Sequence, residues 1–322
     1  MKNIQLFTPL PSITTFEEFE NLKSTPEVFE SLAEKILLRH QLPQSSLTLF
    51  SEGTNIVFAY GENKVIKIFP PFHLDQYTSD SLVLKHLQNK LSVKTPTIEH
   101  EGKIEGWLYI IMTQLEGTLL EELWDEMDRN NKLIIIRQLG ALIKQVHALP
   151  TNGLEAIDCH WEEFISQQIE NCLEHHKSKG LDLALLEQIP SYLEPIKDSL
   201  KQIKAPVLLT GEYTPMNFLV KQVDGIWHIE GLIDFGDATL GRAEYDLLGP
   251  VAFLVQGDKT LLKALLTSYG YSLEMLTQNL SHRLTALILL HKYSNLNIQI
   301  RIPDWKTKVK SLKNLESLLW EF

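Results

Sequence analysis

The sequence predicts an α+β fold of two lobes, in which a small antiparallel sheet carrying one helix precedes a larger, mainly helical lobe. Short β-rich runs separated by turn residues occupy the stretch from 46 to 115. Beyond Gly117 the apolar residues recur mainly with helical spacing, and a β-hairpin between 207 and 237 interrupts these helices. We expect a hinge near 113–117, which divides the chain into lobes at 1–115 and 116–322.

The first lobe is expected to begin with a helix over 26–39, the first ordered element. Thr25 is a suitable N-cap, and Pro26 suits the first helical position because its missing N–H has no intrahelical partner there. Three strands should follow at 47–50, 55–60 and 64–69, then a helix over 75–89 and two strands at 97–99 and 107–112.

The second lobe is expected to consist mainly of helices. The clearest is a long apolar helix over 133–147, which Pro150 terminates. The other expected helices cover 160–178, 182–203, 245–256, 258–268, 273–278, 281–298 and 304–320.

Bulk composition narrows the class of protein. With 322 residues, 44% of them hydrophobic and 22% charged, the chain is neither disordered nor fibrous. The N-terminus lacks the apolar core of a signal peptide, and no run approaches the ~20 apolar residues of a membrane span. Two cysteines, Cys159 and Cys172, show no repeated metal or disulfide spacing. We therefore expect a cytoplasmic protein without a membrane partner.

The formal net charge of −11 disfavours a nucleic-acid partner, whose phosphates would be repelled. It suits a cationic substrate drawn into an acidic cleft, and simple solubility explains it equally well. Two acidic clusters beside tryptophans, at 121–128 and 161–163, admit the same two explanations.

The segment 207–237 carries most of the chemistry-bearing residues. An apolar run leads into Thr210-Gly211-Glu212, Asn217 follows five residues after Glu212, and a second apolar run ends at Asp234. Phosphoryl transfer needs such a set, because one carboxylate faces the substrate hydroxyl while an Asn and an Asp hold magnesium. The segment resembles the catalytic hairpin of the aminoglycoside phosphotransferase family, which is related to protein kinases.

This resemblance implies a bilobal protein-kinase-like fold with ATP, or alternatively GTP, and Mg²⁺ as cofactors. Glu212 stands at the position of the family's catalytic Asp, and Asn217 with Asp234 match its metal ligands. Two residues depart from the family pattern, since Glu212 is one methylene longer than Asp and Thr210 replaces the His that usually precedes Gly-Asp. The resemblance also gives Asp246 a structural role, holding the hairpin by hydrogen bonds.

The first lobe contains the expected nucleotide contacts. Gly53 and Thr54 lie in a turn between the first two strands, where a glycine allows backbone amides to approach phosphate oxygens. Lys67 lies in an otherwise apolar strand and matches the lysine that contacts the α- and β-phosphates. The resemblance places the acidic partner of this lysine at Asp80, where the family usually has Glu, and Asp75 is the alternative.

The strand over 107–112 leads into the expected hinge. By resemblance, backbone groups from Thr113 to Leu115 hydrogen-bond an adenine edge. A buried strand leading into an ordinary loop has the same sequence pattern, so the pattern alone does not distinguish the two interpretations.

We therefore expect an ATP-dependent O-phosphotransferase whose acceptor is a small hydroxylated molecule, neutral or cationic, such as an aminoglycoside-like compound. Glu212 and Thr210 motivate an alternative, a nucleotide-binding pseudokinase or interaction protein with an impaired acceptor site. A kinase with a protein or peptide acceptor is a further alternative, because family resemblance does not select a substrate.

Overall fold

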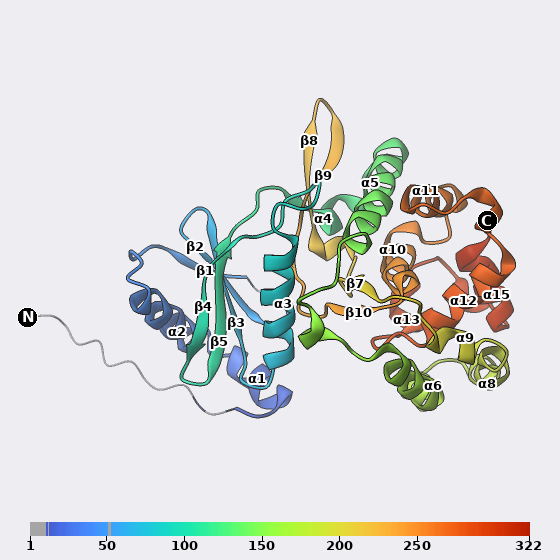
Figure 1. Ribbon diagram of the computed structural model, residues 1–322, viewed down its shortest axis with the longest axis horizontal. Coiled ribbons are helices and arrows are strands. Elements are labelled where there is room, and N and C mark those ends of the chain that lie inside the picture. The colour runs from blue at the N-terminus through green and yellow to red at the C-terminus, as the bar shows by residue number, and fades with distance from the viewer. Residues whose placement is uncertain (1–10, 12, 51–52) are drawn as a thin grey trace, which may run out of the picture. The chain divides into compact units, whose positions relative to one another are not determined.

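A computed structural model describes residue 11 and residues 13–50 and 53–322. The chain forms two compact units, one from residues up to 89 together with 95–116, and one from 90–94 together with 117–322. Figure 1 shows strands with a few helices in the first unit and mainly helices in the second.

The first unit is built on a five-stranded antiparallel sheet with the strand order β1-β2-β3-β5-β4. Its strands are β1 (Leu47–Leu49), β2 (Ile56–Tyr60), β3 (Lys64–Phe69), β4 (Ile98–Ile104) and β5 (Trp107–Thr113). Its helices are α1 (Phe16–Lys23), α2 (Pro26–Arg39) and α3 (Leu74–Leu87). The helix expected over 26–39 is confirmed, and the expected strands are all present, although the strand expected at 97–99 extends to Ile104. The helix expected over 75–89 is α3.

Alternation along the strands places a core on each face of this sheet. Ile66 and Ile68 of β3 pack into one buried cluster with the helices α1 and α2. Phe69 belongs to a second cluster with Tyr77 of α3. Lys67 alternates with Ile66 and Ile68, so β3 presents its lysine to the face of the sheet that α3 covers.

The expectation that the first ordered element begins at residue 26 was wrong, because α1 precedes it. Thr15 caps α1, accepting a hydrogen bond from the backbone of Glu18, and the Glu18 side chain accepts one from the backbone of Thr15. This capping box is a sequence signature of a helix start, so the element was predictable. Thr25 does occupy the N-cap of α2, but its side chain makes no capping hydrogen bond.

The second unit contains two small sheets, one of β6-β8-β9 and one of β10-β7. Its strands are β6 (Thr118–Leu119), β7 (Val207–Leu209), β8 (Phe218–Val223), β9 (Ile226–Leu232) and β10 (Thr239–Gly241). Asp224 and Gly225 form a two-residue turn between β8 and β9, with φ of 51° and 83°, the conformation that a type I′ hairpin requires.

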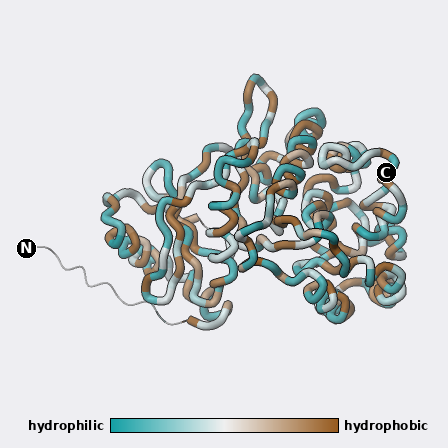
Figure 2. The backbone as a smooth tube through the Cα atoms, viewed as in Figure 1, coloured by the Kyte–Doolittle hydropathy of each residue, from teal (hydrophilic) through white to brown (hydrophobic). Residues whose placement is uncertain are grey.

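Helices make up most of the rest of the second unit. They are α4 (Leu120–Trp124), α5 (Arg129–His147), α6 (Trp161–Ser178), α7 (Leu183–Leu186), α8 (Ile189–Leu193), α9 (Lys197–Lys201), α10 (Leu248–Pro250), α11 (Lys259–Tyr269), α12 (Gln278–Leu289), α13 (Leu296–Gln299), α14 (Trp305–Lys308) and α15 (Leu312–Trp320). Along α5 and α11 hydrophobic and hydrophilic residues alternate (Figure 2), as expected for helices with one buried face.

Gly140 allows close packing between α5 and α11, since a Cβ at this position would lie 2.5 Å from the carbonyl oxygen of Leu265. No helix in the described ranges is both long enough and apolar enough to span a membrane.

Several helices expected to be continuous are broken in the structure. The expected helix over 182–203 is three short helices, because Pro190 lies in the first turn of α8 and Pro195 separates α8 from α9. The expected helix over 281–298 ends at Leu289, and that over 304–320 is interrupted before Ser311, which caps α15. The stretch 243–255 combines a 3₁₀ turn, α10 and a π-helical turn around Gly249-Pro250 rather than one helix.

Candidate active site

Lys67 and Asp80 form a direct ion pair within the first unit. The Lys67 Nζ donates to Asp80 Oδ2 at 2.5 Å, and both side chains are almost fully buried. The alternation of β3 brings Lys67 to α3, and Asp80 lies on that helix. Asp80 therefore reaches the lysine directly despite being shorter than the glutamate usual in the family.

Gly53 and Thr54 are exposed in the turn before β2. Gly53 has a φ of 116°, which an L side chain rarely adopts, and its carbonyl accepts a hydrogen bond from Lys23 of α1 at 3.2 Å. The neighbouring turn residues 51–52, included in the sequence interpretation, lie outside the described residues.

Two backbone N–H groups at the end of β5 and just after it are already hydrogen-bonded within the first unit. The Thr113 N–H donates to Thr97, and the Gln114 N–H donates to Asn63. The Leu115 N–H has no such partner among the residues that the structure describes. Of the N–H groups from Thr113 to Leu115, that of Leu115 is therefore the donor available to a ligand.

In the second unit β7 leads directly into the loop Thr210-Gly211-Glu212. The buried carboxylate of Asp246 accepts hydrogen bonds from the backbone N–H groups of Thr210 at 3.0 Å and Gly211 at 3.2 Å. The expectation that Asp246 holds this loop by hydrogen bonds is confirmed. Gly211 has a φ of 82°, and a Cβ there would lie 2.6 Å from the carbonyl oxygen of Asp237.

His147 at the end of α5 completes this support, a role that the sequence interpretation did not assign. Its Nε2 lies 3.0 Å from Asp246 Oδ2, and its Nδ1 lies 3.0 Å from the hydroxyl oxygen of Tyr269. The only sequence signal was a histidine in the last turn of a helix before Pro150. Asp246 and His147 thus brace the loop in which Thr210 replaces the family's His.

Asn217 connects the Glu212 loop to the hairpin. Its side-chain Nδ2 donates to the Glu212 carbonyl at 3.0 Å and to Glu212 Oε2 at 3.3 Å. Its backbone carbonyl accepts from Ile233, immediately before Asp234. The side-chain oxygen of Asn217 accepts no hydrogen bond from the described part of the chain.

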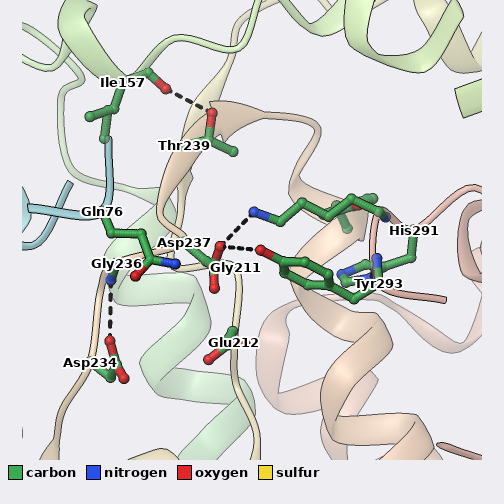
Figure 3. Close-up of polar contacts among 12 residues, drawn as sticks. Gln76, Ile157, Gly211, Glu212, Asp234, Gly236, Asp237, Thr239, His291 and Tyr293 are labelled. Atoms are coloured by element: carbon green, nitrogen blue, oxygen red, sulfur yellow. Dashed lines mark hydrogen bonds and ion pairs between the residues drawn. The ribbon is translucent and has the colours of Figure 1, made fainter. Parts of the chain in front are cut away.

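Asp234 follows β9 in an unusual backbone conformation for a residue with a side chain. Its φ is 63°, its side chain is exposed, and its Oδ1 accepts from the Gly236 N–H at 3.3 Å (Figure 3). A left-handed non-glycine residue carries backbone strain of a kind that concentrates at functional sites. The structure therefore brings Glu212, Asn217 and Asp234 to one end of the β8–β9 hairpin.

The pKa of the Glu212 carboxyl group is higher than that of an ordinary glutamate. Burial, and after it the neighbouring carboxylates of Asp237 and Asp234, together raise its pKa to about 7. The hydrogen bond from Asn217 and the charge of Lys292 act in the opposite direction. Glu212 therefore holds its proton more tightly than an ordinary glutamate does.

The residues present fit a hard cation with oxygen ligands. The side-chain oxygen of Asn217 and the carboxylate of Asp234 provide one amide and one carboxylate, the donor types that magnesium takes. In the described ranges no three His, Cys, Asp or Glu side chains are grouped to hold a metal ion. The donor set therefore resembles a shared protein–phosphate site more than a metal centre built from protein ligands alone.

Comparison with known proteins identifies the family of this chain. A model of the phosphotransferase enzyme family, APH, matches residues 46–278. The GDP complex of wild-type aminoglycoside 2'-phosphotransferase-IIIa superposes with a TM-score of 0.65 at 19% identity, covering 89% of this chain and 96% of that one. ADP-bound aminoglycoside phosphotransferase APH(2'')-Ib gives a TM-score of 0.57 at 17% identity, with 88% and 94% covered.

A third structure, aminoglycoside phosphotransferase APH(4)-Ia, gives a TM-score of 0.57 at 17% identity and covers 80% of this chain and 88% of that one. At such identities these structures show the shared kinase-like fold and nothing finer. The family model, however, matches well over half of the 322 residues. The chain therefore belongs to the phosphotransferase enzyme family, as its hairpin motif indicated.

Proposed function

We propose that this protein is an ATP-dependent O-phosphotransferase that phosphorylates a hydroxyl group of a small molecule. The observation that carries the proposal is the arrangement around Asn217. Its side-chain amide nitrogen holds Glu212, and its oxygen stays open on the hairpin that also ends in Asp234. Phosphoryl transfer uses such a set for positioning and electrostatic stabilisation.

In this proposal the first unit binds the nucleotide. Lys67, held by Asp80, contacts the phosphates, the turn at Gly53 and Thr54 covers them, and the Leu115 N–H donates to the adenine edge. Structural neighbours carry GDP, ADP and, in one streptomycin complex, ATP, which supports a nucleotide as phosphoryl donor. GTP is the alternative donor.

Asn217 and Asp234 are the proposed magnesium ligands. When bound, Mg²⁺ would neutralise phosphate charge during transfer. Glu212 is the proposed catalytic residue, and its task is to orient the acceptor hydroxyl, because the transition state for phosphoryl transfer is loose and early proton abstraction is not required.

A small-molecule acceptor is supported by the relatives. Structural neighbours have been solved with kanamycin and with gentamicin, both molecules that carry several hydroxyl groups. Fold alone does not transfer an acceptor from one protein to another.

The test is turnover of Mg·ATP by the purified chain, compared between the wild type and Asp234→Ala. We expect the substitution to abolish magnesium-dependent turnover while the protein stays folded. Asp224→Asn is the matched control, because Asp224 is an exposed aspartate on the same hairpin and Asn tolerates its left-handed conformation. Unchanged turnover in Asp234→Ala, or failure of the folded wild type to bind ATP, would overturn the proposal.

The raised pKa of Glu212 favours a second candidate, a nucleotide-binding protein that transfers phosphate poorly or not at all. Glu212→Asp separates the two candidates. If the site is built for glutamate, withdrawing the carboxylate by one methylene should lower kcat about 10²-fold, since a misplacement of ~1 Å has effects of that order. A clear gain in kcat would instead identify an impaired site and favour the second candidate.

A further inference from the structure

Asp237, Lys292 and Tyr293 form a polar cluster beside the Glu212 loop, which we call the Asp237 cluster. The Lys292 Nζ and the Tyr293 hydroxyl both donate to Asp237 Oδ1, each at 2.7 Å (Figure 3). Asp237 Oδ2 accepts no hydrogen bond from any described residue. The Lys292 ammonium also lies 4.6 Å from the centroid of the Tyr293 ring, donates to no other described side chain, and is one-third exposed.

This cluster lies next to the proposed catalytic residue. The Asp237 carbonyl oxygen would lie 2.6 Å from a Cβ on Gly211, so the two loops approach each other closely. Figure 3 shows the Asp237 carboxylate between the Gly211–Glu212 loop and the segment that carries His291 and Tyr293. An acceptor whose hydroxyl reaches Glu212 therefore has Asp237 and Lys292 within range of its neighbouring groups.

The backbone of the segment that carries Lys292 makes several contacts with Tyr245 and within itself. The His291 ring stacks on Tyr245 with centroids 4.6 Å apart, and the Lys292 backbone N–H donates to the Tyr245 hydroxyl at 3.0 Å. The Tyr293 N–H donates to His291 Nδ1 at 3.2 Å. Residues fixed in this way are suited to recognition, because little side-chain or backbone ordering remains for the moment of binding.

This segment also lies after residue 278, where the family match ends.

The chemistry of the cluster selects a kind of ligand. Asp237 Oδ2 is an open acceptor and the Lys292 ammonium an open donor, and a pair of adjacent hydroxyl groups satisfies both at once. An ammonium group of a ligand bound at this pair would lie beside the like-charged Lys292, which disfavours it relative to a neutral hydroxyl group.

We propose, on the basis of the proposed phosphotransferase function, that Asp237 and Lys292 are specificity-determining residues that select a neutral polyol with vicinal hydroxyl groups over an amine-rich acceptor. One hydroxyl of the polyol meets Glu212, and its neighbours hydrogen-bond Asp237 Oδ2 and Lys292 Nζ.

Two cyclitols of the same ring size serve as probes: myo-inositol, which is neutral, and 2-deoxystreptamine, which carries two ammonium groups. Transfer of labelled phosphate from Mg·ATP is measured for the wild type, Lys292→Met and Lys292→Arg. We expect the wild type to prefer myo-inositol, and Lys292→Met to lower kcat/KM for it about tenfold or more, mainly through KM. Lys292→Arg should retain the preference for myo-inositol because it keeps the positive charge.

Lys259→Met is the matched control, because Lys259 forms an exposed ion pair elsewhere in the second unit and should leave both acceptors unaffected. A wild-type preference for 2-deoxystreptamine, or an unchanged preference in Lys292→Met, overturns the inference. So does failure of the folded wild type, loaded with a magnesium complex of a non-hydrolysable ATP analogue, to bind myo-inositol. Turnover of Mg·ATP with water as acceptor, and its loss in Asp234→Ala, reports separately on the proposed function.

Discussion

Asp80 and Glu212 are two acids that differ in length from the family pattern in opposite directions, and their surroundings differ. Asp80 is the shorter residue, is almost fully buried and pairs directly with Lys67. Glu212 is the longer residue, and burial, together with the carboxylates of Asp237 and Asp234, raises its pKa to about 7. For these two acids, burial and the surrounding charges matter more than the length of the side chain.

The largest effect on stability should follow from removing the charge that partners Asp80. Lys67→Met leaves a buried carboxylate without its ammonium partner, and we expect the free energy of unfolding to fall by about 3–5 kcal/mol. Urea denaturation of the nucleotide-free protein measures this loss. Nucleotide affinity should fall in the same variant if Lys67 contacts the phosphates.

Lys64→Met is the control, since Lys64 lies on the same strand and pairs with Glu99, and both side chains are about one-quarter to one-third exposed. Its effect should be below about 1 kcal/mol. Equal losses in the two variants would show that the buried pair is no more important than the exposed one.

The stability of the metal-free protein should depend on pH through the carboxyl group of Glu212. The folded pKa of Glu212 is about 7, above its usual 4.5, so the folded state binds the proton more tightly than the unfolded state. Its contribution to stability is present below pH 4.5 and is lost as the pH rises through 7. The size of this contribution is about 3 kcal/mol.

His291 should produce the opposite slope over nearly the same range. Burial lowers its pKa from 6.5 to about 4, so its contribution to stability is present above pH 6.5 and is lost as the pH falls through 4. Glu212→Gln should therefore make the free energy of unfolding rise more steeply with pH than in the wild type. His291→Gln should have the reverse effect, and identical slopes in all three proteins would contradict both assignments.

Much of the fold was predictable because its signals are local. The alternation in Val65-Ile66-Lys67-Ile68 identified β3, and an uninterrupted apolar face identified α5. The helix expected over 182–203 is not continuous, because Pro190 and Pro195 interrupt a segment whose apolar residues recur with helical spacing. Strand pairing between β7 and β10 involves residues about thirty apart, and the sequence contained no pattern that would indicate it.

In the candidate site, too, residues close in sequence were predictable and contacts between distant residues were not. Glu212, Asn217 and Asp234 were proposed from one continuous motif, and the structure places them together on one hairpin. Lys292 pairs with Asp237 across 55 residues, so only the folded chain brings them together. The roles of the site residues remain predictions, because proximity establishes neither metal binding nor catalysis.

The smallest effect should come from restoring the family's residue at Asp80. Asp80→Glu adds one methylene at a position that is 2% exposed and already in contact with Lys67. Extra volume in a well-packed interior usually destabilises by about 1–3 kcal/mol, and an acid at the end of a flexible side chain should lie near the lower limit. Urea denaturation and ATP titration of this variant measure its stability and nucleotide affinity. An increase in both would mean that the first unit has room for glutamate, and that the length of an acid matters here more than the charges around it.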